Sequence, residues 1–362
     1  MRFIDEYRDP ALVKGILAGI RRTADAIGRP VTLMEICGSH TYAIGRFGIR
    51  KLLPDQIRLV SGPGCPVCVT SARDVDTALF LAGLDGVIFA TFGDMLRVPG
   101  TNGESLQKKR ASGADVRVVS SALECIGLAE AFPGKEVVMM GIGFETTSPT
   151  IAAMMETCRK KEIRNLSVFS VHKTVPPAIQ TLISDPSLNI DGFICPGHVS
   201  TIIGSEAYRM IPRAGRAAVI TGFEPVDILE GIWMILEQIA AQEPDVGIQY
   251  GRGVRPEGNR RAVEMLERVF RPVDADWRGI GMIPGSGLAL RGAYAEFDVL
   301  NRCRVPEIHS EEPKGCGCGD VLRGIRTPDQ CPLFRKACTP MNPVGPCMVS
   351  SEGTCSSHYK FY

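Results

Sequence analysis

Residues 57–70, IRLVSGPGCPVCVT, combine an apolar run, a Gly-Pro-Gly turn and two cysteines. The run is typical of a buried strand, and a helical pattern begins near Ser71. Cys65 and Cys68 therefore lie at a strand-to-helix junction, where the helix N-terminus favours a thiolate. The Cys-x-x-Cys spacing also allows the two sulfurs to form a disulfide.

The same strand-loop-helix pattern recurs along the chain. Apolar runs lie at 31–36, 57–61, 86–91 and 115–120, and a second series lies at 137–140, 166–169, 192–194 and 217–220. Alternating β and α segments predict parallel sheets covered by helices on both faces. We therefore expect an α/β protein with two parallel-sheet α/β domains, residues 1–130 and 131–300, and a small irregular Cys-rich iron–sulfur domain at 301–362. Amphipathic helices are predicted at 226–241 and 257–270, and a glycine-rich crossover at 279–287.

Composition limits the possible functions. The chain has 362 residues, 44% of them hydrophobic and 22% charged, with a formal charge of +1. A near-neutral chain does not indicate a nucleic-acid or anionic-membrane surface, and no apolar run approaches the ~18 residues of a membrane span. The first seven residues lack the apolar core of a signal peptide. We expect a cytoplasmic protein with no nucleic-acid or membrane partner.

Thirteen cysteines are distributed unevenly, with six in the first 302 residues and seven from Cys303 to Cys355. Disulfide frameworks belong to small secreted chains, so the C-terminal block predicts a metal or cluster module. Gaps of 14, 6 and 16 residues separate four members of the block, and two more lie among them: Cys316, Cys331, Cys338 and Cys355, with Cys318 and Cys347. Four thiolates on irregular backbone suit a 4Fe–4S cluster or zinc, and the long spacings and adjoining prolines favour the cluster. The spacing does not decide which four of the six are ligands.

Several reactive side chains follow predicted strands. In α/β proteins, ligands bind at the carboxyl ends of the strands, where we place Cys37, His40, Cys65, Cys68 and Asp94. His40 could lower the pKa of Cys37 or hydrogen-bond a ligand held there; the structural alternative is a buried cysteine beside a surface histidine. The Cys65/Cys68 pair is either half of a zinc site or a thiol redox pair, and the flanking prolines and the lack of a nearby second ligand pair favour redox chemistry.

Glu145 lies in GIGFETT, residues 141–147. This glycine turn lacks the spacing and the lysine of nucleotide-binding motifs. Glu145 is a candidate acid/base or partner-binding group, or alternatively a helix cap.

Four motifs together carry a resemblance: CGSHT at 37–41, GPGCPVC at 62–68, GFETT at 143–147 and CTPMNPVGPCMVS at 338–350. Over essentially its whole length the sequence resembles the HypD family of hydrogenase-maturation proteins. The resemblance implies a scaffold on which the Fe(CN)2CO unit of nickel–iron hydrogenases is assembled with a HypC-type chaperone and the cyanide-transfer protein HypE. Whether such a scaffold is itself an enzyme is a matter of definition.

The resemblance also implies roles for particular residues. Cys37 would anchor iron with support from His40, while Cys65 and Cys68 would form a dithiol/disulfide pair; all three cysteines are candidate metal ligands. A 4Fe–4S cluster would exchange electrons with that pair, and the family pattern places its ligands at Cys316, Cys331, Cys338 and Cys355.

Three other functions remain open. A self-contained iron–sulfur thiol/disulfide oxidoreductase, acting on a protein disulfide, would use the same pair and cluster but not Cys37. A zinc-stapled α/β enzyme with a nucleotide at 141–147 predicts zinc and no iron. A non-catalytic binding platform would tolerate loss of the three N-terminal cysteines.

Overall fold

The computed structural model describes residues 5–362 and contains two parallel sheets. The first has the order β2-β1-β7-β8-β9 and the second the order β4-β3-β5-β6. The first sheet consists of β1 (Val31–Glu35), β2 (Ile57–Ser61), β7 (Gly192–Pro196), β8 (Ala217–Thr221) and β9 (Val246–Ile248). The second consists of β3 (Val87–Thr91), β4 (Asp115–Val118), β5 (Glu136–Gly141) and β6 (Leu166–Ser170). All neighbouring strands in these sheets are parallel, which confirms the predicted α/β class.

The two sheets are not consecutive in the sequence, contrary to the division expected at residue 130. The chain forms β1 and β2, crosses to build all four strands of the second sheet, and returns to add β7, β8 and β9 to the first. The unit at 1–130 therefore contributes to both sheets, and so does the unit at 131–300. Buried strands have similar apolar runs, so the local pattern does not identify which strands become neighbours.

Side-chain contacts explain why β7 lies beside β1. The Asp191 carboxylate accepts hydrogen bonds from the Thr32 N–H and from Arg29, each at 2.8 Å. Gly192 faces the helix that covers this sheet, and a Cβ there would lie 2.5 Å from Ile235. The return of the chain is thus fixed by an acidic side chain and a close helix-to-sheet approach.

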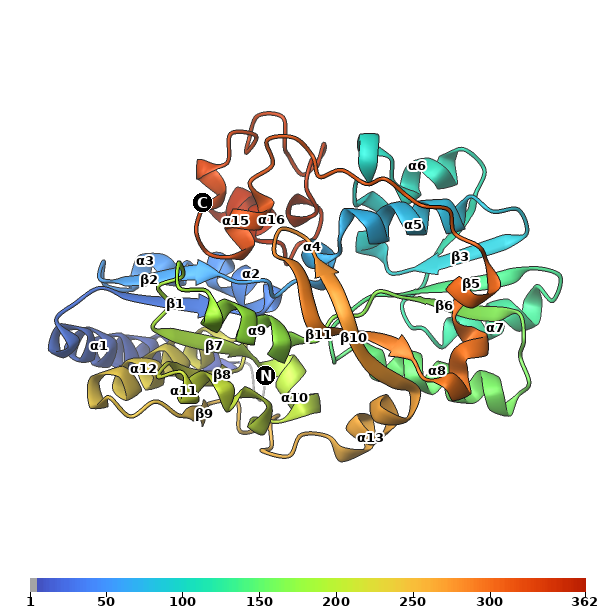
Figure 1. Cartoon of the computed structure of the whole chain (residues 1–362). Helices are drawn as coiled ribbons and strands as arrows, with labels where there is room; N and C mark the ends of the chain where they lie inside the picture. The colour runs from blue at the N-terminus through green and yellow to red at the C-terminus, as the bar shows by residue number, and fades with distance from the viewer. Residues whose placement is uncertain (1–4) are drawn as a thin grey trace.

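The helices cover both faces of the sheets (Figure 1). The α-helices are α1 (Pro10–Ile27), α2 (Gly38–Arg46), α3 (Ile49–Leu52), α4 (Pro66–Val69), α5 (Ala72–Ala82), α6 (Leu106–Ala111), α7 (Glu124–Ala131), α8 (Ser148–Lys160), α9 (Val175–Ser184), α10 (Gly197–Ile203), α11 (Met210–Arg213), α12 (Pro225–Ala241), α13 (Arg260–Val269), α14 (Val299–Arg302), α15 (Cys318–Leu322) and α16 (Thr354–Phe361). The 3-10 helices are η1 (Asp5–Arg8), η2 (Gly93–Arg97), η3 (Thr101–Gly103), η4 (Glu206–Tyr208), η5 (Gly292–Phe297), η6 (Pro328–Gln330) and η7 (Pro346–Met348). Helices α12 and α13 correspond to the two predicted amphipathic helices.

A β-hairpin replaces the glycine-rich crossover expected at 279–287. Strands β10 (Phe270–Trp277) and β11 (Gly281–Leu290) pair antiparallel. Gly279 and Gly281 have φ values of 74° and 97°, which permits the tight reversal between the strands. Isolated bridges pair Trp277 with Thr70 and Gly287 with Lys173. The hairpin therefore contacts the segment after α4 and the loop after β6.

The C-terminal residues form an irregular module, as expected for 301–362. Only short helices occur from 303 to 362, and α16 packs on α2 of the first sheet. In Figure 1 the red C-terminal segment lies above the junction of the two sheets, next to α4. One apolar core joins the two sheets beneath this module and includes Val60, Phe89, Phe193 and Trp277.

No helix within residues 5–362 is long and apolar enough to cross a membrane. The N-terminal stretch in which we expect no signal peptide is described only from Asp5, because residues 1–4 lie outside the described part.

Candidate functional site

Cys37 lies where β1 ends and α2 begins, as its N-cap residue. The loop after β2 closes on it: the Gly38 N–H donates to the Gly64 carbonyl at 2.9 Å, and a Cβ on Gly64 would lie 2.5 Å from the Cys37 Cα. The Gly-Pro-Gly turn therefore allows two loops at the carboxyl edge of the first sheet to touch. This contact brings the Cys-x-x-Cys segment beside Cys37.

The surroundings of Cys37 favour a protonated thiol in the metal-free protein. Burial and the nearby Glu352 carboxylate raise its pKa to about 11, against the opposing effect of the Ser39 and His40 main-chain N–H groups and the Ser39 hydroxyl. The sequence suggested that His40 could lower this pKa, but burial and Glu352 raise it instead. A metal cation bound to the sulfur would displace the proton.

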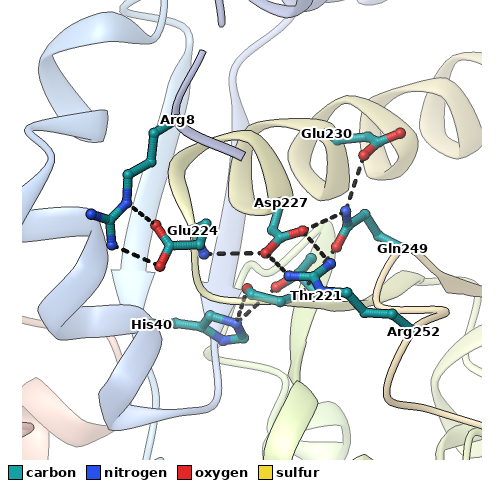
Figure 2. Close-up of polar contacts among 9 residues, drawn as sticks. Arg8, His40, Thr221, Glu224, Asp227, Glu230, Gln249 and Arg252 are labelled. Carbon is teal, nitrogen blue, oxygen red and sulfur yellow. Dashed lines mark hydrogen bonds and ion pairs between the residues drawn. The ribbon is translucent and has the colours of Figure 1, made fainter. Parts of the chain in front are cut away.

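His40 is fully buried, and its imidazole ring is uncharged at neutral pH. Its Nε2 lies 2.9 Å from the Gly222 carbonyl and 2.8 Å from the Thr221 hydroxyl. The contact between His40 and Thr221 is drawn in Figure 2. Burial lowers its pKa to about 4, so the ring is neutral at pH 7. His40 therefore affects the Cys37 thiol through its main-chain N–H rather than through an imidazolium charge.

An ion-pair network holds the loop on which His40 rests. Arg252 contacts both carboxylate oxygens of the fully buried Asp227, which also accepts from Gln249 and from the main-chain N–H of Glu224 (Figure 2). Glu224 in turn pairs with Arg8. These contacts fix the turn after β8 against α12.

A cavity of about 430 Å³ lies over the first turn of α2, and its lining includes Ser39, His198, Phe223 and Glu352 but not Cys37 itself. The ring of Phe223 stacks on both His40 and His198, with centroid distances of 4.6 and 4.0 Å. The Ser39 hydroxyl donates to Glu352 at 2.5 Å. Glu352 was not identified from the sequence, where its only signal is an acidic residue between two cysteines of the C-terminal block.

Cys65 and Cys68 occupy one turn, as predicted. Cys65 caps α4, and its sulfur accepts from the Cys68 N–H at 3.3 Å. Both cysteines are buried. Burial raises the pKa of Cys68, and its hydrogen bond with Cys347 opposes the rise. The pair therefore contacts the C-terminal module directly.

Several of the C-terminal cysteines form a connected chain of contacts. Cys318 and Cys347 lie with their sulfurs 2.8 Å apart, and Cys347 also hydrogen-bonds with Cys68 and Cys355. Of the predicted ligands Cys316, Cys331, Cys338 and Cys355, Cys316 contacts Cys318 and Cys355 contacts Cys347. None of the thirteen cysteines, all within the described residues, forms a disulfide. The close contact between Cys318 and Cys347 was not predicted, because the sequence does not show whether two cysteines 29 residues apart lie close together in the fold.

The four predicted cluster ligands fit a group that binds thiolates. The sulfurs of Cys331 and Cys338 each accept a main-chain N–H at 3.4 Å, from Gly317 and Val344 respectively. A Cβ at Gly345 would lie 2.9 Å from the Cys316 sulfur, so the backbone approaches closely there. Within residues 5–362, no three His, Cys, Asp or Glu side chains converge as for a single metal ion. Cys316, Cys331, Cys338 and Cys355 would supply the four thiolates that a 4Fe–4S cluster uses as ligands.

Asp94 and Glu145 lie on the second sheet. Asp94 is exposed in η2 after β3, so it does not join Cys37 at the first sheet's edge as expected; the two strands belong to different sheets. Glu145 is buried after β5, accepts the Val175 N–H at 2.9 Å, and has its pKa raised by burial to about 7. This contact at the start of α9 agrees with the helix-cap alternative.

Comparison with known proteins identifies the family. The HypD family model, described as "Hydrogenase formation hypA family", matches residues 11–362. The chain belongs to the HypD family. Hydrogenase maturation factor HypD of Rhodobacter capsulatus is 44% identical over 371 residues, covering 100% of this chain and 98% of that protein. HypD of Azotobacter vinelandii is 44% identical over 368 residues (100% and 97%).

A third relative comes from a different genus. A putative hydrogenase expression/formation protein of Methanocaldococcus jannaschii is 43% identical over 354 residues, covering 98% of both chains. Membership in the HypD family confirms the predicted resemblance and assigns the chain a role in hydrogenase maturation.

Proposed function

We propose that the chain holds iron at Cys37 while the Fe(CN)2CO unit of a nickel–iron hydrogenase is assembled, with a HypC-type chaperone and HypE as partners. One observation carries the proposal: the C-terminal module contacts both functional segments of the first sheet. Glu352 of the module accepts from Ser39, two residues after Cys37. Cys347 of the same module hydrogen-bonds with Cys68. Iron at Cys37 would thus lie close to the Cys65/Cys68 pair and the C-terminal cysteines, which we propose supply electrons.

Cys37 is suited to this cargo because a soft thiolate binds low-spin iron that also carries strong-field ligands. Its raised pKa means that iron binding must release a proton, which couples loading to pH. The cavity lined by Ser39, His198 and Glu352 begins two residues after Cys37, and we propose that a partner delivers ligands through it.

We propose that Cys316, Cys331, Cys338 and Cys355 hold a 4Fe–4S cluster. Such a group would supply electrons one at a time. Disulfide exchange between the cysteines of the first sheet and those of the C-terminal module would follow. If Cys65 and Cys68 form a disulfide after giving two electrons, the Cys347 thiolate can attack the Cys68 sulfur and release the Cys65 thiolate. Cys318 then attacks Cys347, which releases the Cys68 thiolate and leaves a Cys318–Cys347 disulfide.

The contacts support this order of exchange. Cys347 touches Cys68 on one side and Cys318, at 2.8 Å, on the other, so each attack joins neighbouring sulfurs. Each exchange moves one disulfide without net oxidation, and two electrons and two protons restore the Cys318/Cys347 dithiol.

The alternative is a self-contained iron–sulfur oxidoreductase acting on a protein disulfide. It would use the same cysteines but would not need Cys37. The contacts around Cys37, namely the close backbone approach of Gly64 and the acidic neighbour Glu352, favour the scaffold, since a disulfide reductase has no use for them.

Infrared spectroscopy of the cyanide and carbonyl bands tests the proposal. Purified chain, HypC-type chaperone and HypE with a cyanide donor should give iron–cyanide bands in wild type and none in Cys37→Ser. Cys65→Ala should retain iron but lose cyanide attachment. The matched control is Cys158→Ser, which removes a buried thiol on α8, far from this site in the fold. Bands of wild-type intensity in Cys37→Ser would favour the oxidoreductase, and bands of wild-type intensity in Cys65→Ala would refute the thiol relay.

A further inference from the structure

The buried carboxyl group of Glu35 joins the two segments that carry Cys37 and Cys65. Glu35 is the last residue of β1 and is fully buried. Its Oε1 accepts a hydrogen bond from the Ser61 hydroxyl at 2.5 Å, where β2 ends. The same oxygen accepts from the Thr41 hydroxyl at 3.1 Å, in α2. One side-chain atom thus connects the segments that follow two neighbouring strands.

The main chain of Glu35 strengthens this connection. Its carbonyl accepts the Gly62 N–H at 2.8 Å, and Gly62 opens the turn that leads to Cys65. A Cβ on Gly62 would lie 3.0 Å from the same carbonyl oxygen, so the turn packs tightly against the end of β1. Side chain and main chain of one residue therefore contact both the start of the Cys-x-x-Cys loop and the helix that Cys37 caps.

Thr41 extends the connection to Cys37 and to the C-terminal module. Its hydroxyl also lies 3.3 Å from the Cys37 carbonyl oxygen, so its single proton is shared between Glu35 and Cys37. The Thr41 carbonyl accepts from the Ser357 hydroxyl at 3.1 Å, two residues after Cys355. Glu35 therefore lies where three cysteine-bearing segments meet.

A carboxyl group is costly to bury unless it is hydrogen-bonded and paired. The partners of Glu35 are the two hydroxyls and Arg50, whose Nη2 lies 3.6 Å from Oε1. Both hydroxyls come from segments that carry the proposed functional cysteines. The cost of burial is therefore offset by contacts that fix those segments.

We propose that Glu35 is a positioning residue, whose carboxyl group holds the Cys37 segment and the Cys-x-x-Cys loop together so that iron on Cys37 stays beside the Cys65/Cys68 pair. The inference rests on the proposed role of Cys37. Without the carboxyl group, each hydroxyl loses this acceptor, and each segment opens locally more often. Each opening exposes the cysteine of that segment.

Alkylation of the metal-free, full-length chain, followed by mass spectrometry of each cysteine peptide, tests the positioning. Glu35→Leu should raise the rates at Cys37 and Cys65 about fivefold, the effect of losing one hydrogen bond of ~1 kcal/mol in each segment. Glu35→Gln keeps one side-chain oxygen as an acceptor and should stay near the wild-type rates. Cys158, buried on α8 in the core of the second sheet, should react at the same rate in all variants.

Variants of the two hydroxyls separate positioning from stability. Thr41→Val should accelerate alkylation of Cys37 alone, and Ser61→Ala should accelerate alkylation of Cys65 alone. These two variants retain the test if Glu35→Leu does not fold. A purely structural role would lower the melting temperature without this pairing of each hydroxyl with one cysteine.

Asp191→Asn is the matched control, because it removes a carboxylate that binds the opposite end of β1, at the Thr32 N–H. It should leave the alkylation rates of both cysteines unchanged. Wild-type rates in both hydroxyl variants would overturn the inference. An equal acceleration at Cys158 would also overturn it, because that result indicates global opening of the chain.

Iron analysis separates this inference from the proposed function. At equal iron concentration, Thr41→Val should carry less of the iron that depends on Cys37 than the wild type does. Wild-type protein without any such iron would refute the proposed function itself. Cys37-dependent iron that is present in the wild type and equally abundant in Thr41→Val and Glu35→Leu would refute only the positioning role of Glu35.

Discussion

Substituting Gly64 by alanine should displace Cys37 without affecting the distant cysteines. The new Cβ would lie 2.5 Å from the Cys37 Cα and closer still to its nitrogen, and neither backbone atom can rotate away. Relief requires the two loops to separate, which breaks the 2.9 Å hydrogen bond from Gly38 to Gly64. Strain of ~1–3 kcal/mol and a lost hydrogen bond of ~1 kcal/mol give a destabilisation of about 2–4 kcal/mol.

Two assays follow this change. Denaturant unfolding should show the loss of stability, and metal analysis should show reduced iron loading at Cys37 with sulfide content unchanged. Gly134→Ala is the matched control, because a Cβ there meets nothing within 4 Å. If Gly64→Ala matched Gly134→Ala in both stability and iron loading, the argued contact between the two loops would not position Cys37.

Three further predictions concern charge and thiol exchange. Glu352→Gln removes the carboxylate that raises the pKa of Cys37, so alkylation of the metal-free Cys37 thiol at pH 8 should accelerate severalfold, and an unchanged rate would count against that interaction. Burial raises the pKa of Glu145 to about 7 from 4.5, so its stabilisation is complete below pH 4.5 and is lost as the pH rises through 7. Glu145→Gln should therefore gain about 3 kcal/mol relative to wild type at pH 8 and little near pH 4.5, measured by urea unfolding; an equal difference at both pH values would contradict the assignment. Cys318→Ser should trap a mixed disulfide between Cys347 and the oxidised Cys-x-x-Cys pair, seen by peptide mapping, and recovery of the intact pair alone would argue against the exchange order.

The sequence predicted the local form of the site well. Cys37 and Cys65 each follow a strand and begin a helix, because apolar runs, turn glycines and N-cap patterns are local signals. The irregular C-terminal module was likewise evident from its lost periodicity. These features depend on residues close together in the sequence.

The features that the sequence did not predict are formed by contacts between segments that are distant in the sequence. Asp94 follows a strand as expected, but that strand belongs to the other sheet. The glycine-rich segment forms a hairpin because its partner strand lies immediately before it and its turn packs against Gly319. The Cys318–Cys347 contact and the approach of Glu352 to Ser39 join positions 29 and 313 residues apart. Spacing alone carries no signal for such pairs.

Iron, acid-labile sulfide and zinc per chain, measured on anaerobically purified wild type and Cys37→Ser, test the central claim most directly. The account predicts about four irons and four sulfides per chain in both proteins, and additional iron in the wild type that disappears with Cys37. Equal iron in the two proteins would remove Cys37 as the assembly site. Zinc without sulfide would contradict the cluster and leave the cysteine module as a structural zinc site.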